Sequence, residues 1–113
     1  MSDTHEDITL PMSAPEKGFY YHYKHDPNGL ETDYAYEVMG VGLDTEDDAN
    51  FMVAYRPLYE SGIYKFGVMF HLRPLPMFMD IVEKTEYTGP RFIKITDPEL
   101  IQRLEKVRDQ MYG

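Results

Sequence analysis

Basic, imidazole and aromatic side chains recur in this sequence at spacings that could build a site for a negatively charged ligand. Tyr20, His22 and Lys24 alternate along an aromatic stretch, so a strand would carry all three on one face. Arg73 and Arg91 each stand beside a proline, which restricts the local backbone. Brought together, these side chains would offer one titrating imidazole and three cations to a carboxylate, a phosphate or an acidic peptide. We therefore expect these five residues to bind a small anion.

The same residues also have a purely structural interpretation. The two arginines would then pair within the protein with Glu37, Glu46 or Asp80, and the imidazole of His22 would hydrogen-bond a backbone carbonyl. Structural ion-pair networks imitate functional sites in this way. Both interpretations stay open on the sequence alone.

A small enzyme is the alternative function. His22 would act as the general base and Glu46 would orient it. Arg73 or Arg91 would stabilise a developing anion. No spacing in the sequence requires these groups to meet, so we expect a binding module without catalytic activity, whose ligand is a small anion or a protein partner. Tyrosines beside an arginine-rich rim and adaptable methionines are typical of protein-binding surfaces.

Metal and cofactor sites are not predicted. His22, His25 and Asp26 form an H-x-x-H-D run, but residues three apart on a strand point to opposite faces. The acidic stretch 44–48 lacks the glycine and the glutamate of a calcium loop. The sequence has no cysteine and no phosphate-binding glycine loop, and its three serines make serine catalysis improbable. We expect neither a metal nor a cofactor.

Charge is distributed unevenly along the 113 residues, which carry 20 acidic and 11 basic side chains and a net charge of −9. Residues 1–55 hold 12 acids and 2 bases, whereas residues 56–113 hold 8 acids and 9 bases. A duplex-binding surface needs clustered lysine and arginine, so the composition argues against nucleic acid. No segment reads as a signal peptide or a membrane span, which predicts a cytoplasmic protein without a membrane partner. The oligomeric state stays open.

Hydrophobic periodicity predicts a single β-rich domain over residues 18–113, preceded by a disordered acidic tail over 1–17. We expect alternating strands over 18–25, 34–43, 51–56 and 63–72, then an extended corner and a short helical turn over 73–79. A last hairpin should pair Ile81–Tyr87 with Arg91–Ile95 around Thr88-Gly89-Pro90. The period then changes to that of a helix over about 98–111, which begins at an Asp97 N-cap or at a capping box of Thr96 and Glu99.

The fold class that these elements predict is mainly β. It is a small, bent antiparallel sheet or SH3-like open barrel of five or six strands, closed at one end by the C-terminal α-helix.

An ordered series of short motifs runs through the chain from Gly18 to Phe92. The motifs are Gly18-x-Tyr20-x-His22-Tyr23-Lys24, Tyr36-x-Val38-x-Gly40, Glu46, Val53-x-Tyr55-x-x-Leu58-Tyr59, Arg73-Pro74 with Met77-Phe78, and Pro90-Arg91-Phe92. In this order they resemble the bacterial domain-of-unknown-function family 1653 (DUF1653), over about residues 18–92. The resemblance implies a small, β-rich, single-domain bacterial protein and supplies no activity. Against the family pattern, the acidic loop 26–33 looks like an insertion.

Overall fold

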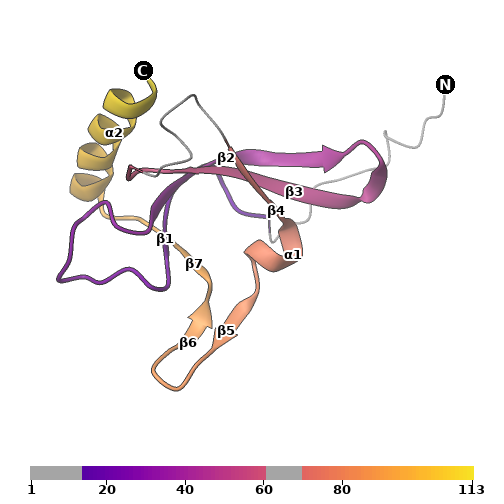
Figure 1. The fold of residues 1–113 in the computed structure, drawn as a ribbon, viewed down its shortest axis with the longest axis horizontal. Helices are drawn as coiled ribbons and strands as arrows, with labels where there is room; N and C mark the ends of the chain where they lie inside the picture. Colours follow the sequence, from indigo (N-terminus) through magenta and orange to yellow (C-terminus); the bar gives the residue numbers. More distant parts are fainter. Residues whose placement is uncertain (1–13, 61–69) are drawn as a thin grey trace.

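Five antiparallel strands curl into a half-barrel that is accompanied by a small second sheet and a C-terminal helix (Figure 1). The computed structural model describes residues 14–60 and 70–113. Its elements are β1 (Gly18–His22), β2 (Ala35–Asp44), β3 (Asp47–Pro57), β4 (His71–Pro74), α1 (Leu75–Phe78), β5 (Ile81–Glu83), β6 (Thr88–Pro90), β7 (Phe92–Lys94) and α2 (Pro98–Tyr112). The main sheet has the order β4-β3-β2-β1-β7, and β5 pairs with β6. The predicted fold class is confirmed.

Strand alternation divides the apolar residues between the two faces of the main sheet. The inner face, which α1 covers, carries a mostly aromatic cluster of Tyr20, Tyr36, Val38, Val53, Tyr55, Leu75, Phe78 and Phe92. The outer face carries a second cluster under α2, made of Phe19, Ala35, Leu58, Ile95 and Leu104. Each face therefore buries its apolar side chains against a different helix.

The predicted C-terminal helix is confirmed and extends to Tyr112. Asp97 is its N-cap, and the carboxylate accepts a hydrogen bond from the backbone N–H of Glu99 at 3.2 Å. Leu104 is completely buried, with Leu100 and Val107 packed beside it against the outer cluster. Leu100, Leu104 and Val107 thus form the docking face of α2.

A β-bulge interrupts the pairing of β2 with β3 between Val38 and Gly40. Gly40 has a φ of +154°, which residues with a side chain rarely adopt. Glycine at this position therefore permits the bulge. Beyond the bulge, β2 and β3 continue as a long hairpin that projects away from α2 (Figure 1).

The predicted last hairpin is wrong. β5 pairs with β6, so that Thr88–Pro90 is a strand and the turn lies at residues 84–87, while β7 leaves this hairpin and pairs with β1. The turn is closed by the backbone N–H of Lys84, which donates to the carbonyl of Tyr87 at 2.7 Å. The Tyr87 ring folds over Gly89, where an added Cβ would lie 2.7 Å from the hydroxyl. Gly89 thus makes room for a ring rather than forming a turn.

Two other predictions fall wholly or partly outside the described residues. Most of the expected strand 63–72 lies there, and its described end belongs to β4; the short helical turn expected within 73–79 is α1. Of the expected tail, residues 14–17 are described and contact the sheet. Ala14 packs against the inner cluster, and Glu16 pairs with Lys94 at 3.3 Å. The disordered tail stays a prediction.

The end of α2 is joined to the sheet by a buried carboxylate. Glu37 of β2 is only 9% exposed and accepts hydrogen bonds from Arg56 of β3, at 3.0 Å, and from Arg108 of α2, also at 3.0 Å. The Arg56 guanidinium lies 4.0 Å from the centre of the Tyr112 ring, and the Tyr112 hydroxyl donates to the carbonyl of Pro57 at 2.6 Å. A buried charge needs such partners because it has lost its hydration.

Replacement of Glu37 by Gln should lower the free energy of unfolding by about 2–4 kcal/mol, because two arginines would lose their counter-charge in a mostly buried site. The matched control is Glu31→Gln, since Glu31 and Arg103 form an exposed pair whose loss should cost less than about 1 kcal/mol. Urea denaturation of both variants measures the difference. Equal losses would show that the buried pair does not hold α2.

Candidate functional site

The ring of Phe92 is the point at which the inner cluster meets the polar residues predicted to bind a ligand. It stacks on Phe78 with 4.2 Å between ring centres and an interplanar angle of 3°. The ring also makes edge contacts with Tyr36 and Tyr55, at 5.8 and 5.6 Å, and with His22 at 5.3 Å. These aromatic contacts hold the Phe92 ring in one position. The polar side chains that pack against it are therefore also held in place.

Arg73 extends towards the Phe92 ring from β4, where it lies opposite Val53 of β3. Its Nε donates to the Tyr55 hydroxyl at 3.3 Å, and its guanidinium lies 5.8 Å from the centre of the Phe92 ring. In the described part of the chain no carboxylate lies within ion-pair distance of Arg73. The side chain is partly buried, so a cation here is held by a hydroxyl and a ring rather than by a counter-charge.

His22, at the end of β1, lies on the other side of Phe92 and also stacks against Tyr34, with 5.5 Å between ring centres. Its Nδ1 accepts a hydrogen bond from the backbone N–H of Lys24 at 3.2 Å, which leaves the proton of the neutral ring on Nε2. Burial and, to a smaller extent, the charges of Arg91, Lys24 and Arg73 together lower the pKa of His22 to about 4. The ring is therefore neutral at pH 7.

His71 is a second imidazole beside Arg73, and the sequence analysis did not select it. Its ring makes an edge contact with Tyr55 at 5.2 Å. Burial lowers its pKa, and the charge of Arg73 adds to the effect. The sequence could have indicated His71 as a neighbour of Arg73, because residues two apart on a strand lie on the same face of the sheet.

A hollow of about 190 Å³ lies beside His22 and was also not predicted. It is lined by Asp33, Tyr34 and Tyr59. Tyr34 has a φ of +58°, an uncommon conformation for a residue with a large side chain and one that often marks a functional position. The hydroxyl groups of Tyr59 and Tyr36 are hydrogen-bonded to each other at 2.7 Å. Two stacked rings and a pair of hydroxyl groups thus border the cationic cluster.

Arg91 carries the internal ion pair that the structural interpretation anticipated. Its Nε and Nη2 donate to the two carboxylate oxygens of Asp80 at 2.7 and 3.1 Å. Hydrogen bonding from Arg91 lowers the pKa of Asp80, so both groups stay charged and Asp80 partly offsets the charge of Arg91. Lys24 lies exposed in the turn that follows β1. Arg91 and Lys24 therefore add positive charge near His22, whereas Arg73 has no carboxylate within ion-pair distance among the described residues.

Two predicted site residues lie elsewhere. Tyr20 is 6% exposed, its ring packs edge-on against Phe78 and its hydroxyl donates to the carbonyl of Glu16 at 2.9 Å, so it belongs to the core. Glu46 lies in the turn between β2 and β3, at the far end of the hairpin from His22 (Figure 1). At about 3.3 Å per residue, the eight residues from Val38, where β2 leaves β1, to Glu46 span roughly 25 Å. The arrangement in which Glu46 orients His22 is not formed.

His25, the second histidine of the H-x-x-H-D run, has partners of its own. Its ring stacks on Tyr21 with 3.6 Å between ring centres, and its Nδ1 lies 2.7 Å from the carbonyl oxygen of Asp33. Over residues 14–60 and 70–113, no three potential metal ligands are gathered.

The fold and this site define a small half-barrel β-protein with an arginine at the open side of an aromatic inner face. The chain belongs to DUF1653, because the model of that family, described as a protein of unknown function, matches residues 18–94. A crystal structure of a DUF1653 protein from Bordetella bronchiseptica is similar, with 26% sequence identity and a TM-score of 0.58 over 78% of this chain and 99% of that chain. A search of curated proteins found no match. The family predicted from the motifs is thus confirmed.

No helix in the described part of the chain is long and apolar enough to cross a membrane.

The imidazole of His22 should titrate near pH 4 in the folded protein, which NMR of its ring protons measures directly. Because this pKa lies below the ordinary value of about 6.5, protonation favours the unfolded chain. The contribution of His22 to stability is therefore complete above pH 6.5 and is lost as the pH falls towards 4. The expected loss is about 1 kcal/mol, since the partly exposed ring is screened by solvent.

The variant His22→Gln provides the control for this titration. It removes the proton-binding group, so its unfolding free energy should depend less on pH between 6.5 and 4 than that of the parent protein. A His22 resonance that titrates near pH 6.5 would contradict the burial and charge environment described above.

Proposed function

We propose that this protein is a non-enzymatic binding module for a small anion and that Arg73 is the main contact. The observation that carries the proposal is the partly buried guanidinium of Arg73, which has no carboxylate partner in the described part of the chain. Buried or partly buried charges are ordinarily paired, because desolvation of an isolated ion is costly. An anion would supply the missing counter-charge.

The surroundings of Arg73 support the same ligand chemistry. Its charge lowers the pKa of His22, His71 and Asp80, so these groups all lie within its electrostatic reach. The neutral ring of His22 carries its proton on Nε2 and so offers an N–H donor rather than negative charge. Arg91 contributes a further positive field that Asp80 only partly cancels. A carboxylate or phosphate fits this set of donors, with the planar guanidinium able to bind two of its oxygens.

The proposal excludes Tyr20 and Glu46 from ligand contact. Tyr20 supports the cluster from within the core, and Glu46 is too distant to take part. The enzymatic alternative required Glu46 to orient His22, so the geometry favours binding over general acid–base chemistry. The proposed contact residues are Arg73 and His22, with Arg91 and Lys24 contributing longer-range attraction.

Arg73→Gln should weaken the binding of inorganic phosphate or sulfate by at least about ten-fold, which corresponds to about 1.4 kcal/mol. Glutamine keeps a hydrogen-bond donor but removes the charge. Isothermal titration calorimetry at pH 7 and constant ionic strength measures the affinity. Arg103→Gln is the matched control, because Arg103 is an exposed residue of α2 that pairs with Glu31.

The proposal fails if both variants and the parent protein bind the anions equally, or if the parent protein binds neither anion at millimolar concentration. Urea denaturation shows whether Arg73→Gln remains folded, so loss of binding is separated from loss of structure.

A further inference from the structure

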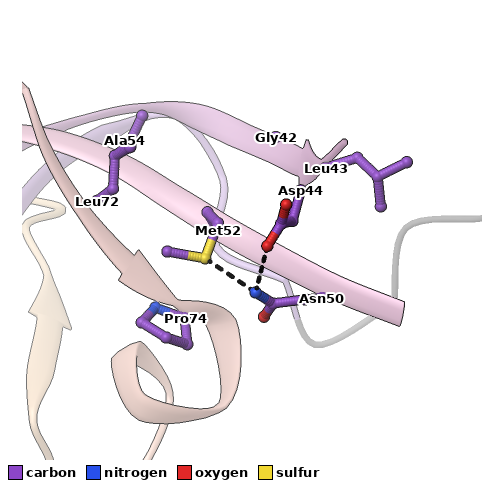
Figure 2. Close-up of a pocket in the computed structure, with 8 residues that line it drawn as sticks. All are labelled: Gly42, Leu43, Asp44, Asn50, Met52, Ala54, Leu72 and Pro74. Carbon is purple, nitrogen blue, oxygen red and sulfur yellow. Dashed lines mark hydrogen bonds between the residues drawn. The ribbon is translucent and has the colours of Figure 1, made fainter. Parts of the chain in front are cut away.

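A groove of about 440 Å³ is lined by the residues drawn in Figure 2. Strand alternation places Met52, Ala54 and Leu72 on the outer face of the sheet, opposite to Val53 and Tyr55 of the aromatic cluster. The floor and walls of the groove come from three neighbouring strands: Gly42 of β2, Met52 and Ala54 of β3, and Leu72 and Pro74 of β4. Helix α2 covers the outer face at the other end of the sheet, where it packs on Phe19 of β1 and Ile95 and bonds to Glu37 of β2 (Figure 1). The groove is therefore the part of the outer face that α2 leaves uncovered.

The small residues Gly42 and Ala54 leave space in the groove, and the larger apolar residues Met52 and Leu72 line its sides. An added Cβ at Gly42 would meet no atom within 4 Å, so the space above this residue is open. Leu72 is 64% exposed, an unusual position for a large aliphatic side chain next to other apolar groups. Met52 lies beside it, and methionine adapts its shape to different partners. The volume suits one or two apolar side chains of a bound segment.

One rim of the groove is negatively charged and held in place. The carboxylate of Asp44 accepts hydrogen bonds from the backbone N–H of Glu46 at 2.8 Å and from Asn50 Nδ2 at 3.2 Å. Asn50 also contacts the sulfur of Met52 at 3.5 Å, which joins the charged rim to the apolar floor (Figure 2). Glu46, in the adjoining turn, and Asp47, the first residue of β3, are both exposed. Among the residues that line the groove, none is basic.

We propose that this groove binds a segment of another protein in which apolar side chains alternate with lysine or arginine. The apolar floor would take the aliphatic or aromatic side chains, and the acidic rim would attract the basic ones. An extended segment suits the three strands, because alternate side chains of an extended chain point the same way. Charge argues against the chain's own N-terminal segment, since residues 1–13 contain three acidic side chains and no lysine or arginine. This site is separate from Arg73, which lies on the inner face.

The probe is the synthetic peptide Lys-Leu-Lys-Val-Lys-Leu-Lys, added to the ¹⁵N-labelled full chain at low ionic strength. We expect the backbone amides of Met52, Ala54 and Leu72 to shift in NMR spectra. A peptide with glutamate in place of lysine tests the charge requirement, and one with serine in place of the apolar residues tests the groove. Both should bind at least about ten-fold more weakly.

Matched variants locate the site. Leu72→Ser should weaken binding at least about ten-fold, whereas Leu30→Ser, which alters an equally exposed leucine in the loop between β1 and β2, should not. Asp44→Asn should also weaken binding. Its control is Asp26→Asn, because Asp26 makes the same kind of hydrogen bond to the backbone two residues on.

Three results would overturn the proposal. The first is no shift at millimolar peptide. The second is equal binding of the serine peptide, which would indicate general attraction to an acidic surface. The third is that the groove amides shift with protein concentration in the absence of peptide, which would identify a second copy of the chain as the occupant. Gly42→Val provides an independent check, because it fills the open floor with a residue that strands favour and should block the peptide without unfolding the sheet.

Discussion

The stack of Phe92 on Phe78 is the interaction on which the rest of the structure depends. Phe92 belongs to β7, the strand that closes one edge of the main sheet on β1, and Phe78 belongs to α1, the helix that covers the inner face. Their contact therefore joins the first and last strands of the sheet to the segment between them. The same ring touches His22 and Arg73. The packing of Phe92 in the core therefore also determines where His22 and Arg73 lie.

Charge is segregated by this arrangement. The acids that give the chain its net charge of −9 are concentrated in the first half of the sequence, and many lie in the loop between β1 and β2 or at the end of the β2–β3 hairpin. Two basic residues of the second half reach the inner face, Arg73 on β4 and Arg91 just before β7. A global negative charge thus coexists with a local positive site, which is the condition under which a small anion can be recognised selectively.

The sequence predicted the parts of the fold that depend on local pattern. The alternating aromatics of β1, the alternating Tyr36 and Val38 of β2 and the helical spacing of Leu100, Leu104 and Val107 all reflect periodicity that tertiary contacts reinforce. The last hairpin was misplaced because Thr88-Gly89-Pro90 has turn composition, whereas Tyr87 packs over Gly89 and moves the turn to residues 84–87. Distances across the fold were harder to foresee. Glu46 follows a long hairpin away from the site, and the proximity of Arg73 to His22 arises only because β4 and β1 both reach Phe92.

The apparent pKa of His22 in sulfate and in chloride tests the central claim most directly. Sulfate stays doubly charged from pH 3 to 7, and NMR titrations at equal ionic strength separate binding from screening. A sulfate ion bound at Arg73 would favour the protonated ring and should raise the pKa of His22 from about 4 by about one unit. An identical pKa in the two salts would contradict the assignment of an anion site to Arg73.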